Sequence, residues 1–240
     1  MLKAADFRQI ARESLKGKWL LAVGTGFIAY LLGGSIMAVG GSGSVSVNSE
    51  TAEQAASGLA AEPGLAAFLL MALATVSVIA IVYAVVMTII GGAVSMGYAK
   101  FNLNLVNRSN PSVEDVFSQF KYFKKAFVMR FLKGLYVLLW TLCFIIPGIV
   151  ASYSYAMAPY ILYENPDMTG SEALAASKEL MKGNKWRLFC LGFSFFGWSL
   201  LSAITLGIGF LFLRPYAEAA GAAFYREIKW ERMKQQAGME

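Results

Sequence analysis

The sequence predicts an all-α, polytopic membrane protein of about six transmembrane helices, arranged as three hairpins that each follow an amphipathic surface helix. Hydrophobic residues make up 57% of the 240 residues and charged residues only 15%, against roughly 25% charged in ordinary globular domains. Several runs exceed the ~18 apolar residues that indicate a membrane span. Basic residues avoid one set of loops, which is how membrane proteins fix their orientation. A single integral membrane domain, residues 1–240, is therefore expected.

Residues 1–18 predict a short amphipathic helix on the cytoplasmic side. Its apolar residues recur at helical spacing, and basic residues occupy its other faces. The apolar residues are Phe7, Ile10, Ala11 and Leu15. Such a helix either lies on a membrane surface or packs against its own protein, and the sequence leaves both interpretations open.

The first predicted hairpin consists of spans at residues 19–39 and 65–97. Residues 40–64 join them as a flexible loop that is rich in Gly, Ser and Ala and contains no Lys or Arg, so the loop is assigned to the outside. The second span is longer than the ~20 residues that a perpendicular helix needs, so it tilts or extends beyond the bilayer. Small residues at its end, among them Gly97, have the spacing that allows close helix approach.

The second predicted hairpin follows a basic cytoplasmic segment, residues 98–126. Within this segment, a turn and helix cap at residues 110–112 precede a second amphipathic helix. Residues 127–147 and 149–163 then form two spans with a tight turn at Pro147-Gly148, because a single crossing would place the next basic segment outside. The second of these spans is short and either crosses fully or is re-entrant.

The third hairpin follows a cytoplasmic amphipathic helix in residues 164–187, which we expect Ser171 to cap. Its spans are residues 188–206 and 208–225, with a turn near residues 206–209, and a polar basic tail follows at 226–240. The second and third hairpins share the dipeptide Pro-Tyr and an acidic residue after a Tyr. Together with the similar segments ARESLKGKW and ASKELMKGNKW, this indicates an internal threefold repeat.

The distribution of charge supports this topology. Six spans with both termini inside leave 20 of the 21 Lys and Arg residues on the cytoplasmic side, with Arg214 as the exception. Run length alone places the segment at 98–126 and the tail at 226–240, and both are basic, so they support this orientation independently of the third and fourth spans. This topology places the N- and C-termini in the cytoplasm.

Motifs along most of the chain resemble those of a known family. They are ARESLKGKW, IPGI, APYILYENP, LMKGNKW and RPYAEAAGAAFYREI. With these motifs the chain resembles the uncharacterised bacterial integral membrane proteins grouped as domain of unknown function 975. The resemblance implies a multi-span protein of the bacterial cytoplasmic membrane. It implies no activity, and no functional residue can be transferred from it.

The strongest candidate site lies in the last hairpin, where ionisable residues interrupt an apolar run. Arg214 and Glu218 are four residues apart, so a helix places them on one face. Intramembrane charges often mark a substrate or ion path, but a self-contained pair or a link between helices is an equally simple explanation and is favoured here. Prolines in the same hairpins either free carbonyl groups for a ligand or only kink their helices. The candidate polar site comprises Arg214, Glu218, Pro215, Tyr216, Pro159 and Tyr160.

A second set of candidate residues lies where the surface helices meet the membrane. Basic and aromatic side chains at these positions are suited to anionic lipid, although simple orientation of the protein explains the same charges. The candidate lipid contacts are Lys16, Lys18, Trp19, Lys124, Lys125, Lys182, Lys185 and Trp186.

The sequence favours a non-enzymatic membrane protein that acts through lipids, through membrane-protein partners or through a second copy of itself. It contains no His, and we find no metal-ligand cluster, phosphate-binding loop or nucleophile motif, so no catalytic residue, cofactor or nucleic-acid partner is predicted. The alternative is a small transporter or permease subunit with Arg214 and Glu218 beside its path.

The predicted topology can be tested by cysteine labelling. A cysteine placed in the loop at residues 40–64 should react with a reagent added from outside, because that loop lacks basic residues. A cysteine near Lys182, in a basic segment, should not react. The reverse pattern would contradict the predicted orientation.

Overall fold

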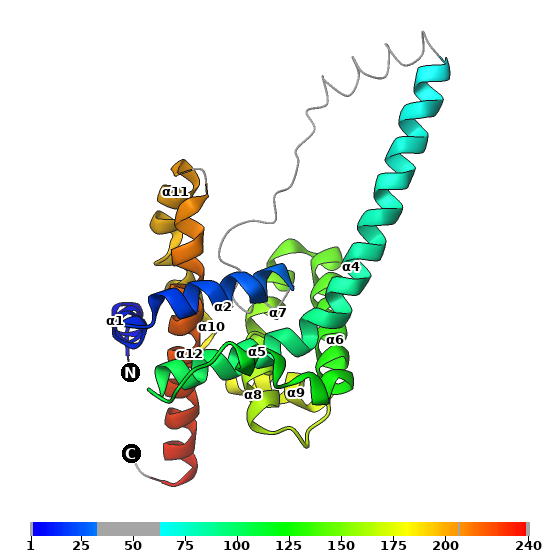
Figure 1. Ribbon diagram of the computed structural model, residues 1–240. Helices are drawn as coiled ribbons and strands as arrows, with labels where there is room; N and C mark the ends of the chain where they lie inside the picture. Colours follow the sequence, from blue (N-terminus) through cyan, green and yellow to red (C-terminus); the bar gives the residue numbers. More distant parts are fainter. Residues whose placement is uncertain (1, 33–62, 206, 239–240) are drawn as a thin grey trace. The chain divides into compact units, whose positions relative to one another are not determined.

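The computed structural model describes residues 2–32, 63–205 and 207–238, and the regular structure in these ranges is helical (Figure 1). The chain forms two compact units, residues 1–40 with 88–240, and residues 41–87. Helix α4 (Pro63–Val106) belongs to both units, because its residues 63–87 lie in the second and its residues 88–106 in the first. The candidate residues lie in the first unit, which is described below.

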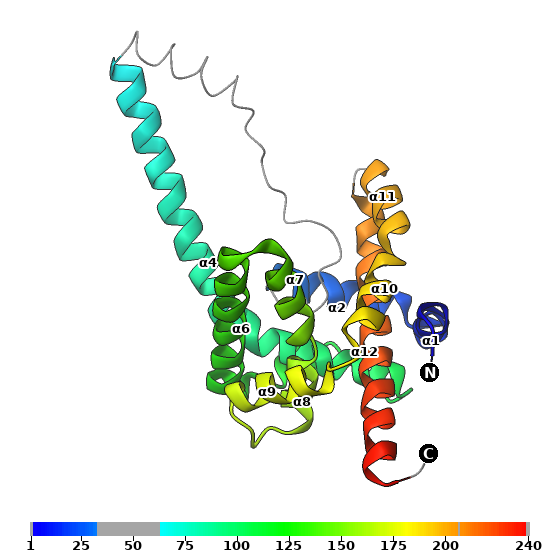
Figure 2. The ribbon, with the colours of Figure 1, turned by 180° about the vertical axis from the view of Figure 1, so that it is seen from behind.

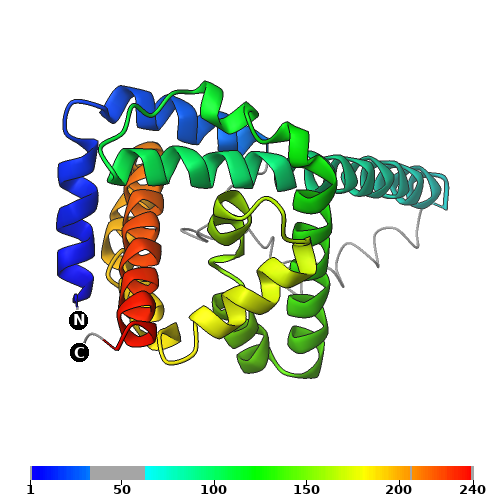
Figure 3. The ribbon, with the colours of Figure 1, turned by 90° about the horizontal axis from the view of Figure 1, so that it is seen from below.

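Helix α12 is the element around which the first unit packs. In chain order the helices of this unit are α1 (Ala4–Leu15), α2 (Trp19–Leu31), the end of α4, α5 (Glu114–Phe117), the 3-10 helix η1 (Phe120–Tyr122), α6 (Phe123–Cys143), α7 (Ile145–Ser154), α8 (Ala158–Glu164), α9 (Gly170–Leu180), α10 (Lys185–Phe193), α11 (Phe196–Ile204) and α12 (Ile208–Gln236). Helix α12 contacts α1, α2, α9, α10 and α11, and Figure 3 shows α1 running beside it. Small side chains allow these helices to approach closely. The buried alanines of α12 are Ala217, Ala219, Ala220, Ala222 and Ala223.

Helix α1 buries three of the four apolar residues that the sequence places on one face. Phe7, Ala11 and Leu15 are buried, and the Phe7 ring meets the Phe224 ring of α12 edge-on, with 5.3 Å between the ring centroids. The buried face of α1 is therefore used to pack against its own protein. Whether α1 also lies on a membrane surface stays a prediction.

Helices α6 and α7 form a hairpin, but the chain turns before the predicted position (Figure 2). Phe144 has an extended backbone between the two helices, so the turn is at this residue and not at Pro147-Gly148. Pro147 lies in the first turn of α7, where a proline is tolerated because the missing N–H has no partner in the helix. Gly148 allows the two helices to touch, since a Cβ atom there would lie 2.1 Å from Thr141 Oγ1.

The predicted span at residues 149–163 is interrupted. Helix α7 ends at Ser154, and α8 begins at Ala158 with Pro159 in its first turn. Pro159 therefore starts a helix and does not kink one, as its fixed φ favours at this position. The carbonyl of Ser154, at the interruption, accepts a hydrogen bond of 2.9 Å from the Ser177 hydroxyl of α9.

The segment before α6 also differs from the prediction. Helix α4 continues to Val106, and the expected second surface helix is reduced to the single turn of α5 followed by η1. Asp115 explains the difference because it ties this segment to α4. Its carboxylate forms an ion pair of 2.7 Å with Lys100 and accepts hydrogen bonds from Asn104 Nδ2 at 3.0 Å and from the Ser112 backbone at 3.1 Å.

The predicted helix before the third hairpin is present as α9, and Thr169 caps it in place of Ser171. The Thr169 backbone N–H donates to Glu172 Oε2 at 2.7 Å, while the Glu172 backbone N–H donates to Thr169 Oγ1 at 3.3 Å. This reciprocal pair is a capping box, and the backbone hydrogen bond holds the pKa of Glu172 below its usual value.

Gly207 precedes α12, and its φ of 86° lies in the left-handed region that glycine adopts readily. The helix that follows is longer than predicted. Helix α12 contains Pro215 and continues to Gln236, so most of the predicted polar tail at 226–240 is helical.

Three segments of the described chain are long and apolar enough to cross a membrane. They are Glu114–Cys143, Ile145–Glu164 and Lys185–Ile204, and the apolar helices Trp19–Leu31 and Leu70–Ile79 are shorter. Six spans are therefore not found among the described residues. Part of the first predicted span, residues 33–39, lies outside them.

The contact between α4 and α5 gives a test of the packing. A Cβ atom on Gly97 would lie 2.0 Å from the Val116 carbonyl oxygen, so Gly97→Ala should lower the free energy of unfolding by about 1–3 kcal/mol or more. Thermal unfolding of the purified protein in detergent measures this change.

Gly134→Ala is the matched control for Gly97→Ala. Gly134 lies inside α6, and nothing lies within 4 Å of the position of its Cβ atom, so this variant should be neutral or stabilised by about 0.5–1 kcal/mol. Equal stability of the two variants would contradict the close approach of α4 and α5.

Candidate functional site

The six residues of the predicted polar site lie in different environments. Pro159 and Tyr160 in α8 and Pro215 and Glu218 in α12 are buried in the protein, whereas Arg214 and Tyr216 are partly exposed. A single path that all six residues line is therefore not formed. Arg214 and Glu218 lie one helical turn apart in α12, as their spacing predicts. The sequence did not indicate that different helices surround the two side chains.

Arg214 faces helix α2. Its guanidinium group lies over the Tyr30 ring, 3.7 Å from the ring centroid, which is a cation–π contact. The two residues line one pocket together with Gly26, Phe27 and the beginning of α12. A cation on an aromatic face is partly satisfied without a carboxylate, so Arg214 has a structural explanation in this pocket.

Glu218 points into the core and is only 2% exposed. Its carboxylate acts electrostatically on Tyr98 of α4, Tyr160 of α8 and Lys133 of α6. A buried carboxylate is costly unless charges and hydrogen bonds surround it, and these elements supply a lysine and two phenols. The arrangement explains how Glu218 is accommodated and connects four helices around it.

Two stacked tyrosine rings connect the surroundings of Glu218 to the end of α8. The Tyr160 and Tyr225 rings are nearly parallel, with 5.1 Å between their centroids, and the Tyr225 hydroxyl donates to Glu164. Glu164 in turn forms an ion pair of 2.7 Å with Lys229. Sequence reasoning assigned no role to Tyr98, Lys133 or Tyr225, because each became relevant only through helices distant in the chain.

A set of polar contacts, which we call the C-terminal ion-pair network, explains why α12 continues to Gln236. Arg187 binds Glu231 through two hydrogen bonds of 2.6 and 3.2 Å, a geometry that fits the planar guanidinium group. The network is completed by the pair Lys229–Glu164, by Arg226 to the Val106 carbonyl at 3.1 Å and by Arg232 to the Glu179 carbonyl at 2.9 Å. These contacts join the end of α12 to α4, α8, α9 and α10.

The predicted lipid contacts fall into two groups. Three of the lysines are bound by the protein itself, since Lys18 donates to Ser109, Lys125 donates to Pro166 and Lys182 forms an ion pair with Glu179. The hydrogen bond from Lys182 is the main reason that the pKa of Glu179 is lowered.

The side chains of the remaining lysines make no hydrogen bond or ion pair with the residues that the structure describes. These lysines are Lys16, Lys124 and Lys185. Of the two tryptophans, Trp186 is exposed and stacks on Phe189, whereas Trp19 packs beside Tyr216. The three lysines and Trp186 are therefore the members of the predicted set that remain available to a lipid surface.

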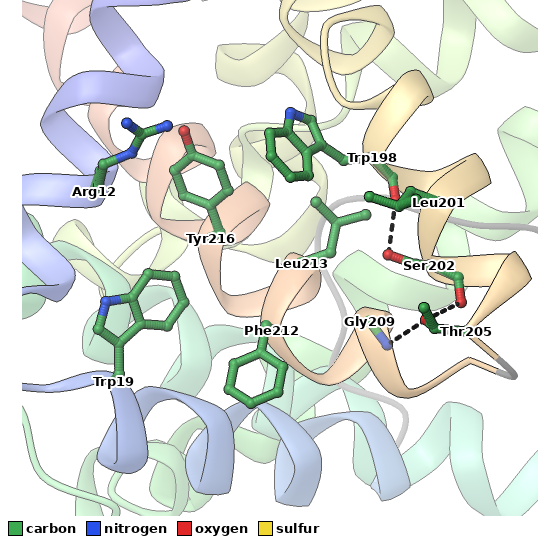
Figure 4. Close-up of a pocket in the computed structure, with 10 residues that line it drawn as sticks. All are labelled: Arg12, Trp19, Trp198, Leu201, Ser202, Thr205, Gly209, Phe212, Leu213 and Tyr216. Atoms are coloured by element: carbon green, nitrogen blue, oxygen red, sulfur yellow. Dashed lines mark hydrogen bonds between the residues drawn. The ribbon is translucent and has the colours of Figure 1, made fainter.

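A groove of about 350 Å³ lies between α1, α2, α11 and α12 (Figure 4). Its residues are Arg12, Trp19, Trp198, Leu201, Ser202, Thr205, Gly209, Phe212, Leu213 and Tyr216. Arg12 is the one charged residue among them, and the Tyr216 hydroxyl points toward the end of the groove where Arg12 lies. Sequence reasoning predicted Trp19 as a lipid contact and Tyr216 as a polar-site residue, and the structure brings them together here.

The hydroxyl groups at the other end of the groove are satisfied by their own helices. The Ser202 hydroxyl donates to the Trp198 carbonyl at 2.7 Å, and Thr205 Oγ1 accepts from the Gly209 N–H at 3.3 Å. The groove thus combines a cationic end with a largely apolar wall. Within the described ranges no group of three or more acidic, Cys or His residues is placed to hold a metal ion.

Comparison with known proteins gives one match. A family model described as "Protein of unknown function (DUF975)" matches residues 1–154 and 141–232. No curated protein and no solved structure matches the chain.

The burial of Glu218 can be tested by thiol labelling. In a chain with Cys143 and Cys190 replaced by Ala, a Glu218→Cys thiol should remain unreactive toward a water-soluble reagent in opened membranes, because the side chain is buried among four helices. Lys16→Cys, at an exposed position of the same chain, is the control and should react rapidly.

Reaction of Glu218→Cys at a rate close to that of Lys16→Cys would show that water reaches this position. Removal of the buried carboxylate takes away a negative charge that interacts with Lys133, and this loss can destabilise the fold. Size-exclusion chromatography therefore checks that the variant remains folded. A labelled and folded variant would favour the transport alternative.

Proposed function

The chain belongs to the DUF975 family of proteins of unknown function, and we propose that it is a non-enzymatic, multi-pass membrane protein that binds anionic lipid at its cytoplasmic surface. The membrane in the proposal is the bacterial cytoplasmic membrane, with both termini in the cytoplasm. This orientation is supported by the loop at 40–64, which lacks Lys and Arg, and by the basic segments between the other spans.

The observation that carries the proposal is the apolar surface of the two hairpins. Large apolar side chains at the tip of α6 and α7 face outward, with Leu142 82% and Ile146 75% exposed. Phe196, Leu200 and Ile204 of α11 are exposed in the same way. Continuous apolar surface of this kind is rare on soluble monomers, whereas hydrocarbon solvates it without cost.

The polar end of the same unit supports a role for lipid headgroups. The C-terminal ion-pair network occupies the far end of α12 from the apolar hairpin tip, and it satisfies most of the charges there within the protein. Three lysine side chains take no part in this network or in other described hydrogen bonds and ion pairs. They are Lys16, Lys124 and Lys185. Available lysines beside apolar helices are suited to attract an anionic membrane surface.

The non-enzymatic part of the proposal rests on the sequence, which has no His and no recognisable catalytic motif. A membrane-protein partner or a second copy of the chain is compatible with the same exposed hairpins. Transport through a path beside Arg214 and Glu218 is the alternative function. The burial of Glu218 and the contact of Arg214 with Tyr30 disfavour it, because a path must reach water.

The lipid proposal predicts a preference that depends on the three available lysines. In nanodiscs of mixed phosphatidylcholine and phosphatidylglycerol, quenching of Trp fluorescence by spin-labelled lipid should show phosphatidylglycerol enriched around the protein. The triple variant Lys16→Gln/Lys124→Gln/Lys185→Gln should lose most of this enrichment, since each Lys near an anionic surface contributes roughly 1 kcal/mol. Added salt should have the same effect.

The triple variant with Arg at these three positions is the matched control. It retains the charge and should retain the enrichment, whereas a loss in both triple variants would indicate a packing effect. An equal distribution of the two lipids around the wild-type protein would overturn the proposal.

A further inference from the structure

We propose that the groove between α1, α2, α11 and α12 binds one anionic phospholipid, with its phosphate at Arg12 and an acyl chain along the wall formed by Trp198, Leu201 and Phe212. The inference rests on the proposed function and names one defined lipid site within it. This site is separate from the surface lysines, because Lys16, Lys124 and Lys185 do not line the groove.

The headgroup end is defined by Arg12. The residue is exposed on α1, and its side chain makes no hydrogen bond or ion pair with any described residue, so its guanidinium donors are available. A guanidinium group binds phosphate through two parallel hydrogen bonds. Trp19 and Tyr216 lie at the same end, and residues of these types are favoured at the level of lipid headgroups (Figure 4).

The apolar end suits a hydrocarbon chain. Trp198, Leu201 and Phe212 line the groove and are also exposed on the surface of the hairpin, so a chain can enter sideways from the bilayer. The Ser202 and Thr205 hydroxyl groups are hydrogen-bonded to backbone groups of their own hairpin. Few polar atoms at this end of the groove are therefore available to a polar ligand. The volume of about 350 Å³ lies within the range of ligand pockets.

The charge of the groove favours an anionic lipid over a zwitterionic one. None of the described residues that line it is acidic, so a choline group beside Arg12 would meet a cation without a compensating carboxylate. Free phosphate has the same headgroup chemistry, but it would gain nothing from the apolar wall. The lipid is therefore the better occupant.

The test measures phosphatidylglycerol binding to the delipidated full chain in detergent by native mass spectrometry. The wild-type protein should retain one phosphatidylglycerol in preference to phosphatidylcholine. Arg12→Gln should weaken this binding by about fivefold, the effect of one basic residue at an anionic headgroup. Arg12→Lys, which retains the charge, should lose less.

Two further variants test the hydrocarbon end. Leu201→Trp fills the groove and should weaken binding by at least as much as Arg12→Gln. Leu200→Trp is the matched control, because Leu200 is the preceding residue, is similarly exposed (59% against 53% for Leu201) and does not line the groove. Lys178→Gln is the control for loss of charge, because Lys178 is exposed on α9, does not line the groove and is not one of the three surface lysines.

Equal weakening by Arg12→Gln and Lys178→Gln would overturn the proposal in favour of general surface charge. So would equal binding of the two lipids, equal effects of Leu200→Trp and Leu201→Trp, or displacement of the lipid by inorganic phosphate. The outcome is distinct from that of the nanodisc experiment. One retained lipid without general enrichment would support this site and contradict the broader proposal. General enrichment that does not depend on Arg12 and Leu201 would support the broader proposal and contradict this site.

Discussion

The close packing of α12 against its neighbours is the constraint on which the other features of the first unit depend. Its alanine-rich surface allows α1, α2, α9, α10 and α11 to approach, and this approach buries Glu218 among groups from α4, α6 and α8. The same helix carries Arg214 to the Tyr30 ring and Tyr216 to the groove beside Arg12. Larger side chains at the alanines would move these helices apart. The burial of Glu218, the contact of Arg214 with Tyr30 and the groove would then be lost.

The two ends of α12 have opposite physical character. The hairpin end presents apolar side chains outward, as a protein does when hydrocarbon is its solvent. The other end is held by the C-terminal ion-pair network, whose members are half-buried and paired within the protein. A polar end and an apolar end on one helix suit the proposed place in a membrane, with headgroups at one side.

Local sequence patterns predicted the features that depend on neighbouring residues. Helical periodicity identified the buried face of α1, and the glycine at 207 identified the last turn. The Pro147-Gly148 pair led to a wrong position for the turn between α6 and α7, because proline is common both in turns and in the first turn of a helix. The extended backbone of Phe144 places the turn before Pro147, and Gly148 then lies against Thr141 where α6 and α7 meet.

The features that could not be predicted depend on residues far apart in the chain. Residues 226–236 look like a solvated tail until Glu164, Glu179 and Arg187 are brought beside them. Likewise, the spacing of Arg214 and Glu218 fixed their shared helix, but the rings and charges that surround each come from α2, α4, α6 and α8. The groove was invisible in the sequence, since four helices contribute to its lining.

The position of α12 in the chain has a consequence for biosynthesis. Every other described helix precedes it, so a chain that is made and inserted from its N-terminus completes those helices before their common partner exists. Until α12 arrives, Lys133, Tyr98 and Tyr160 lack the carboxylate that they surround, and Arg187 lacks Glu231. The preceding helices therefore lack these contacts until α12 has been made, and α12 then joins them into one packed unit.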